Sequence, residues 1–232
     1  MGSGKRGGAL LILVALAIAG CGKKTPPTDA DRGDPAATKA VKVEAVRAWL
    51  DPDQVKKYDN TVAVVVHNTS DKLATGVTIV ARWSNGYQTK QTGAIALPPG
   101  ERGIFLLGPF KPDPPVEGDP QAQVQVDALK ASPVAKAPVK FSGVELSGKC
   151  RATGKTTNTF KHNHPGTSGL VAGLKDGRIV TAGSIFFEEP GLQPGKEGSF
   201  SADLEPLCPP ASDEPDEWVA FAQLGEQELK AP

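Results

Sequence analysis

Hydrophobic and polar residues alternate along most of the chain after residue 60, and this alternation predicts β-strands. Because successive side chains of a strand point to opposite faces, residues two positions apart share a face. Val62, Val64 and Val66 are predicted to share one face of a strand. No segment after residue 20 keeps a helical period over three turns, so the pattern predicts an all-β fold. The same spacing predicts further core positions at Val77, Ile79, Ala81, Trp83, Val124, Val126, Ala128, Leu170, Leu174, Ile185, Phe187, Phe200, Val219 and Phe221.

The chain contains a weak internal repeat. "ATGVTIVARWSNGYQT" at residues 74–89 resembles "SGLVAGLKDGRIVT" at residues 168–181, and in both a strand pattern ends at a turn dipeptide, Asn-Gly or Asp-Gly. Both dipeptides tolerate the positive φ angles of a tight hairpin. "LPPGERGIFLL" at residues 97–107 then matches "LQPGKEGSFSA" at residues 192–202. The shared order of these segments predicts two copies of one β-rich unit.

Each copy contains about six or seven short predicted strands, a number that is typical of an immunoglobulin-like β-sandwich. The segments "VVHNTSDKLATGVTIVARW" and "GLKDGRIVTAGSIFF", with the Pro-Gly turns that follow them, also resemble small bacterial FxLYD-type sandwich domains. This resemblance implies a fold and no chemistry. We therefore expect two tandem antiparallel sandwich domains, at residues 41–131 and 139–230, joined by a linker at residues 132–138.

An uninterrupted apolar segment near the N-terminus predicts a secretion signal. Lys5 and Arg6 precede the run "ALLILVALAIA" at residues 9–19. At about 1.5 Å per helical residue, this run spans only about half of a ~30 Å hydrocarbon core. It is therefore too short for a stable transmembrane helix and fits the core of a signal peptide, which we predict at residues 1–20.

The residues that end this run resemble a lipid-attachment motif. Ala19 and Gly20 precede Cys21, and "IAGC" resembles the lipobox of bacterial lipoproteins. The resemblance implies cleavage after Gly20 and a lipid on the Cys21 thiol, which would anchor the chain to a membrane of the cell envelope. Gly22 stands where an aspartate would favour the inner membrane, and this favours the outer membrane. Residues 21–40 are polar and proline-rich, and they predict a flexible tether behind the lipidated cysteine.

The charge balance and the missing motifs argue against several classes of function. Lys and Arg total 26, and Asp and Glu total 26, so the chain lacks the basic surplus typical of nucleic-acid binding. No G-x-S-x-G, H-E-x-x-H, P-loop or Rossmann glycine motif is present. We therefore expect a non-catalytic protein without a cofactor. It would bind a protein or another envelope component through sandwich loops or sheet edges, and the sequence leaves open whether it binds a small molecule.

Two cysteines remain once Cys21 is assigned to lipid, and secreted chains commonly pair their cysteines. Cys150 and Cys208 both lie in the second copy of the repeat. A disulfide between them would fix the acidic loop after residue 208 to the sheet and stabilise the fold by about 4 kcal/mol. Two free thiols and ligation of a metal ion are the alternatives.

The segment "KHNHP" is the sharpest candidate for a metal site. In an extended segment, His162 and His164 point to the same side, close enough to share Zn²⁺ or Cu²⁺. Two ligands do not complete a site, and Asp176, Glu188 or Glu189 would have to supply a third. A solvent-exposed loop is the simpler interpretation. The alternative function is therefore a periplasmic metal-binding protein that uses this loop.

The acidic loops and the tryptophans are weaker candidates. Residues 111–120 and 208–217 contain clustered carboxylates, but neither loop has the spacing of an EF-hand, so solvated loops are predicted. Trp49, Trp83 and Trp218 would have to lie together at the surface to bind a glycan. Two of them lie in alternating strand patterns, which predicts core or half-core packing there.

Overall fold

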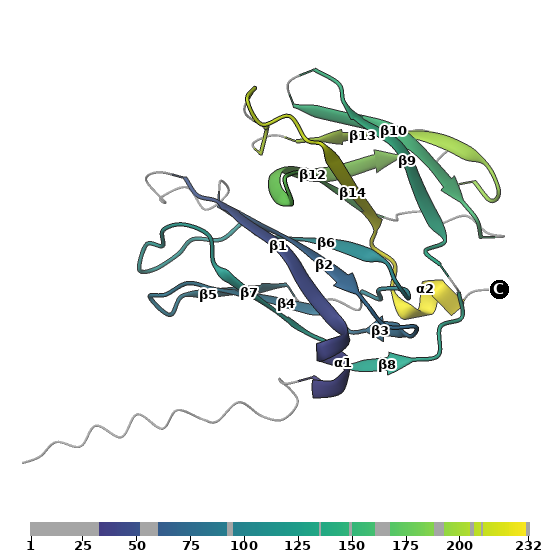
Figure 1. Cartoon of the computed structure of the whole chain (residues 1–232), viewed down its shortest axis with the longest axis horizontal. Coiled ribbons are helices and arrows are strands. Elements are labelled where there is room, and N and C mark those ends of the chain that lie inside the picture. Colours follow the sequence, from purple (N-terminus) through teal and green to yellow (C-terminus); the bar gives the residue numbers. More distant parts are fainter. Residues whose placement is uncertain are drawn as a thin grey trace, which may run out of the picture.

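The structure, a computed structural model, describes the chain between residues 33 and 230 apart from several gaps. Within that part the protein is all-β, as the alternation predicted, and the named strands pair antiparallel. Figure 1 shows two groups of strands side by side, with β14 (Glu217–Ala222) running from the upper group toward the lower one. The described residues are 33–51, 60–91, 95–134, 136–148, 150–160, 168–187, 193–204, 207–209 and 211–230.

The first half of the chain forms three small sheets. Two three-stranded sheets have the orders β1-β2-β6 and β5-β4-β7, and β3 pairs with β8. Val62, Val64 and Val66 are buried as predicted, but so are Ala63 and Val65 between them. Strand β2 is therefore covered on both faces, because strands of the second half contact its neighbours β1 and β6. The elements are α1 (Pro35–Ala40), β1 (Val41–Trp49), β2 (Thr61–Asn68), β3 (Leu73–Thr75), β4 (Thr78–Arg82), β5 (Gln88–Gln91), β6 (Arg102–Leu107), β7 (Gln121–Gln125) and β8 (Ala128–Lys130).

The second half forms one six-stranded sheet with the order β14-β11-β12-β13-β10-β9. Strand β12 has ten residues and pairs with both β11 and β13, so it joins the two parts of the sheet. The corresponding strand of the first half, β5, has four residues, and the sheets divide there. The elements are β9 (Val139–Leu146), β10 (Arg151–Asn158), β11 (Gly169–Lys175), β12 (Arg178–Phe187), β13 (Glu197–Asp203), β14 (Glu217–Ala222) and α2 (Glu226–Lys230).

The two halves arrange their strands in the same order. The first half runs β1-β2-β6 and then β5-β4-β7, and the second half runs β9-β10-β13 and then β12-β11-β14. In both halves, the outer strand that comes first in the chain also contains a shift of register. The shift lies between Val43 and Ala45 in β1, and opposite Gly154 in β9. The repeat in the sequence thus coincides with a repeat in strand order.

One hydrophobic core, here called the shared core, extends through both halves. Phe105 of β6 belongs to the same cluster of buried side chains as Val219 and Phe221 of β14. The ring centroids of Phe105 and Phe221 lie 6.4 Å apart. The second half also has a core of its own, the inner cluster, on the other face of its sheet. The inner cluster consists of Ala152, Val171, Ile185, Phe200, Ala202 and Leu204.

Helix α1 lies within the segment that was predicted as the tether. The Asp34 carboxylate accepts hydrogen bonds from the backbone N–H groups of Ala36, at 2.8 Å, and Ala37. Pro35 stands in the first turn, where its fixed φ suits a helix and its missing N–H costs nothing. Ala37 is buried against the first half. A cap and a proline therefore start a helix that is too short to show a helical period in the sequence.

Val126 connects α1 to the end of β7. The Asp34 N–H donates to the Val126 carbonyl at 2.8 Å, and the Val126 N–H donates to the Thr38 hydroxyl at 3.2 Å. Both the N–H and the C=O group of Val126 therefore bond to the α1 segment and not to a neighbouring strand. The even spacing of Val124, Val126 and Ala128 therefore does not come from one strand: β7 ends at Gln125, and Ala128 begins β8, which pairs with β3.

Candidate functional site

Several residues of the predicted sites lie outside the described part of the chain, so the lipid anchor and the metal site stay predictions. Asp176, a possible third metal ligand, occupies the β11–β12 turn with a φ of 51°. Within the described residues, no group of three or more His, Cys, Asp or Glu side chains is placed to hold a metal ion. The residues outside the described ranges are Cys21, His162, His164, Glu188 and Glu189.

The predicted disulfide between Cys150 and Cys208 is confirmed. The two Cα atoms lie 4.9 Å apart, and the bridge joins residues 58 positions apart in the sequence. Beside the bridge, the Leu204 N–H donates to the Cys150 carbonyl at 3.0 Å. The bridge therefore holds the chain that follows β13 against the start of β10, and the free-thiol and metal-ligand alternatives for these two cysteines are excluded.

The acidic loops brace the halves to which they belong. In the first half, the Asp119 carboxylate accepts a hydrogen bond from the Ala48 N–H at 2.7 Å, near the end of β1. In the second half, the Asp216 N–H donates to the Leu174 carbonyl at 2.9 Å. The Asp216 carboxylate accepts from the Asp176 N–H at 3.2 Å, so this loop holds the β11–β12 hairpin. These carboxylates are therefore used within the fold.

Two of the three tryptophans are occupied by contacts within the first half. Trp83 is buried, donates its indole N–H to a backbone carbonyl at 3.0 Å, and packs against the rings of Tyr87 and Phe110. Burial in this cluster raises the pKa of Tyr87 above its ordinary value. Trp49 is half-buried, and the Arg47 guanidinium lies 5.3 Å from its ring centre. The core packing predicted for Trp83 is therefore observed.

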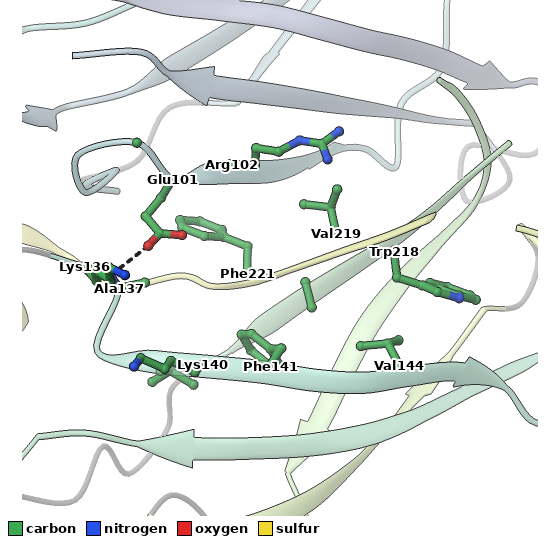
Figure 2. Close-up of a pocket in the computed structure, with 13 residues that line it drawn as sticks. Glu101, Arg102, Lys136, Ala137, Lys140, Phe141, Val144, Trp218, Val219 and Phe221 are labelled. Atoms are coloured by element: carbon green, nitrogen blue, oxygen red, sulfur yellow. Dashed lines mark hydrogen bonds between the residues drawn. The ribbon is translucent and has the colours of Figure 1, made fainter. Parts of the chain in front are cut away.

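A cleft of about 520 Å³ opens between the two halves. It is lined by β9 and β14, and by residues 100–102 where β6 begins. Figure 2 shows the side chains of Phe141 and Val144 pointing from β9 toward β14, and the side chain of Trp218 on β14 lying on the side of Val144. The third tryptophan, Trp218, therefore lines this cleft.

Strand β14 divides its side chains between two cores. Val219 and Phe221 belong to the shared core, whereas Trp218 and Ala220 pack against the inner cluster. Trp218 and Ala220 are only half-buried. They stay open to the cleft because β14 and β9 are the two opposite edges of the sheet, and no described strand pairs with the outer side of either.

A bulge in β9 turns its apolar side chains toward the same space. Gly143 and Val144 together oppose the single residue Gly154 of β10. Gly143 has a φ of 58°, a conformation that favours glycine. The extra residue shifts the alternation of the strand, so Phe141, Val144 and Leu146 all pack against the inner cluster. The bulge thus places three apolar residues on one face although their spacing is irregular.

Arg102 joins carboxylates from two strands on one wall of the cleft. Its Nε atom lies 2.6 Å from Glu44 Oε2 on β1, and its Nη1 atom contacts the Glu217 carboxylate at the start of β14. His67 Nδ1 lies 3.0 Å from the other oxygen of Glu44. These groups link β1, β2, β6 and β14, and they balance the positive charge of Arg102.

The wall beside the start of β9 carries positive charge that is not balanced in this way. The Glu101 carboxylate accepts a hydrogen bond from the Ala137 N–H at 3.1 Å (Figure 2). Lys136 and Lys140 line the cleft and are exposed. Neither lysine forms an ion pair with a described residue. The cleft therefore combines an apolar floor with two unpaired lysines at one end.

The edge strands of the two halves differ in whether a loop bonds to them. Within the described residues, no strand pairs with the outer edge of β9 or β14. The corresponding strands of the first half are β1 and β7. Helix α1 leads directly into β1 and bonds to Val126 after β7, and the Asp119 carboxylate caps the Ala48 N–H near the other end of β1. The second half has no such cover among its described residues.

The cleft was not predicted from the sequence. Its walls come from three distant parts of the chain, near residues 101, 140 and 218, so no local motif marks it. One signal was present: Phe141, Val144 and Leu146 break the strict alternation next to a glycine, and such a break indicates a bulge.

No family model, curated protein or solved structure matches the chain. Among the described residues, no helix has both the length and the apolar character needed to cross a membrane. We therefore infer the function from the residues and geometry of the chain itself.

Proposed function

We propose that this chain is a membrane-anchored lipoprotein of the cell envelope that binds a protein or another envelope component without catalysing a reaction. The observation that carries the proposal is "IAGC", with Cys21 directly after an apolar run of signal-peptide length. A diacylglyceryl group on the Cys21 thiol and a further acyl chain on the new amino group would anchor the protein firmly, because two or more chains hold far better than one. Gly22 after the cysteine favours the outer membrane.

The fold proposed for this lipoprotein is a tandem pair of immunoglobulin-like sandwiches. The same strand order in both halves supports two copies of one unit. The six-stranded sheet of the second half would then be a sandwich whose two layers stay joined where β12 pairs with β13. The disulfide between Cys150 and Cys208 supports a location outside the cytoplasm, where such bonds persist.

The cleft supports a binding role for the folded part. Open sheet edges can pair with an added strand, and half-buried aromatic side chains such as Trp218 supply much of the affinity in protein interfaces. These features favour binding over catalysis.

Substitution of Cys21 with serine tests the anchor. The wild-type chain is expected in the outer-membrane fraction, with an intact mass that lacks residues 1–20 and includes acyl chains. The Cys21→Ser variant should carry no acyl chain and should leave that fraction. A matched control replaces Cys150 and Cys208 with serine, which removes the disulfide and leaves the anchor in place. If the fraction and the intact mass were unchanged in Cys21→Ser, the proposal would be wrong.

The metal-binding alternative predicts a different result. A titration of the purified chain with Zn²⁺ or Cu²⁺ would show binding that is lost when His162 and His164 are both replaced by alanine. Binding of the metal with micromolar affinity by the wild-type chain, and its loss in this variant, would favour metal handling. Equal responses of the two proteins would exclude these histidines as the site.

A further inference from the structure

We infer that the cleft between β9 and β14 binds an extended, acidic segment of a partner protein, which adds as a strand along the outer edge of β9. This inference rests on the proposed function, since it names the kind of partner that the sheet edges would bind. Carboxylates of the segment would lie at Lys136 and Lys140. Its apolar side chains would pack against Phe141, Val144 and Trp218.

The backbone of β9 supplies the first part of the site. Alternate residues of a strand direct their N–H and C=O groups toward opposite edges, and an edge without a neighbour can pair with another chain. β9 (Val139–Leu146) pairs with β10 on one side, and within the described residues no strand occupies the other. At its start β9 lies close to β14, where Val139 and Ala222 share a buried cluster, so an added segment would pair with the residues after Val139. At about 3.3 Å per residue, these seven residues span about 23 Å, which is enough for an extended segment of about six residues.

The first half shows how this fold treats the same edge when no partner is needed. There the acidic loop bonds to the edge strand, because the Asp119 carboxylate accepts from the Ala48 N–H of β1. Both acidic loops also bond to the hairpin of their own half, through Asn85 in the first and through Asp216 in the second. Among the described residues, the loop of the second half makes no corresponding bond to β9, so this edge keeps its backbone groups available next to the cleft.

The apolar floor of the cleft supplies the second part of the site. The bulge at Gly143 brings Phe141 and Val144 onto the face that looks into the cleft, opposite Trp218. A strand added along β9 would place every second side chain on this face. The three side chains would then lose their remaining exposure to water, and burial of apolar area at a partly exposed tryptophan is typical of a strong contact in protein interfaces.

Charge decides which segments fit. Arg102 is already balanced by Glu44 and Glu217, so it adds little attraction for an acidic partner. Lys136 and Lys140 are exposed at the entrance, have no ion pair with a described residue, and outnumber the carboxylate of Glu101, which lines the same wall and bonds to the Ala137 N–H. They favour a segment with carboxylates at that end and disfavour a basic one, since like charges across an interface oppose binding.

The experiment selects peptides against the full chain, purified in detergent. The probe is a displayed library of random ten-residue peptides. Selected sequences are expected to alternate apolar and acidic residues. Affinity for a synthetic copy of a selected peptide, measured by fluorescence anisotropy, should fall at least about tenfold in a variant with Lys136→Glu and Lys140→Glu. The matched control reverses two exposed lysines on other strands, Lys42→Glu and Lys90→Glu, and should keep the wild-type affinity.

N-methylation of the selected peptide tests strand addition itself. Only alternate N–H groups of an added strand face β9, so one of two peptides methylated at odd or at even positions should lose binding and the other should keep it. Binding should also slow hydrogen exchange at the amides of β9 and leave that of β5 unchanged. Equal behaviour of the two methylated peptides would overturn the inference of an added strand.

Other outcomes would overturn the choice of partner. Failure to enrich any peptide on the wild-type chain above the Lys136→Glu, Lys140→Glu variant would exclude an acidic peptide as the occupant. An acidic peptide would also be excluded if no peptide bound and the wild-type chain instead bound phosphatidylglycerol vesicles or polygalacturonate, with that binding lost in the variant. These measurements use purified protein, so they do not depend on the anchor. Failure of the Cys21→Ser fractionation test would remove the proposed location and leave the peptide result intact.

Discussion

The shared core predicts that the two halves unfold as one unit, and the substitution Phe221→Ala tests this. Phe221 lies on β14 with 4% of its surface exposed, and its ring centroid is 6.4 Å from that of Phe105 in the first half. Removal of a buried phenylalanine side chain typically costs about 3–5 kcal/mol of the free energy of unfolding. Because a domain of ordinary stability has about 5–15 kcal/mol, the variant is expected to remain largely folded for measurement.

Native-state hydrogen exchange, followed by mass spectrometry, measures this loss separately in each half. Amides in β2 report on the first half, and amides in β11 report on the second half. A loss of about 3–5 kcal/mol should accelerate exchange through global unfolding by about two to four orders of magnitude in both strands. The matched control is Phe186→Ala, which deletes the same side chain at a position that is 60% exposed. It should change the free energy of unfolding by no more than about 0.5 kcal/mol.

The result that would refute this reasoning is uneven exchange. If Phe221→Ala accelerated exchange in β11 and left β2 unchanged, the first half would be folding without help from β14. The contact between Phe105 and Phe221 would then join two independent units, and the shared core would not couple them.

Three further predictions concern stability, and urea denaturation measures each of them. Replacement of Cys150 and Cys208 with serine should lower the free energy of unfolding by about 4 kcal/mol, because the bridge closes a loop of 58 positions; a loss below about 1 kcal/mol would contradict this. Gly183→Ala should cost about 1–3 kcal/mol or more, because a Cβ atom would lie 2.1 Å from a backbone carbonyl oxygen of β13; wild-type stability would show that the strands separate freely. A double-mutant cycle of Arg102→Met and Glu217→Gln should give a coupling of about 1 kcal/mol that shrinks with added NaCl, because both groups are partly exposed; a coupling that ignores salt would contradict the ion pair.

The alternation of the sequence predicted the strands well where a strand has one buried face. It predicted less where both faces are buried, because apolar residues then follow one another without a period. This is the case in β2, where Ala63 and Val65 are buried beside the predicted valines, and in β11. Helix α1 was missed because six residues cannot show a helical period, although Asp34 and Pro35 are typical of a helix start.

The disulfide could be predicted because two cysteines in a predicted secreted chain leave few ways to pair. The cleft could not, because its lysines, aromatic residues and open edges come together only when the halves pack. Trp218 is a good example: the sequence indicates half-core packing, which is correct, but not that the exposed part of the ring faces a cleft. The pattern of one strand shows which of its faces is buried, but it does not show whether another strand pairs with its edge.

If the chain is exported as proposed, the position of β14 also constrains how it folds after export. Parts of the fold are joined over long stretches of chain: the Arg47 guanidinium donates to the Ile179 carbonyl over 132 positions, and Arg102 meets Glu217 over 115. If the N-terminus leaves a translocation channel first, the strands of the first half would expose apolar surface to solvent until the strands of the second half follow. During that interval the nascent chain would be at its most vulnerable to proteases and in greatest need of a chaperone.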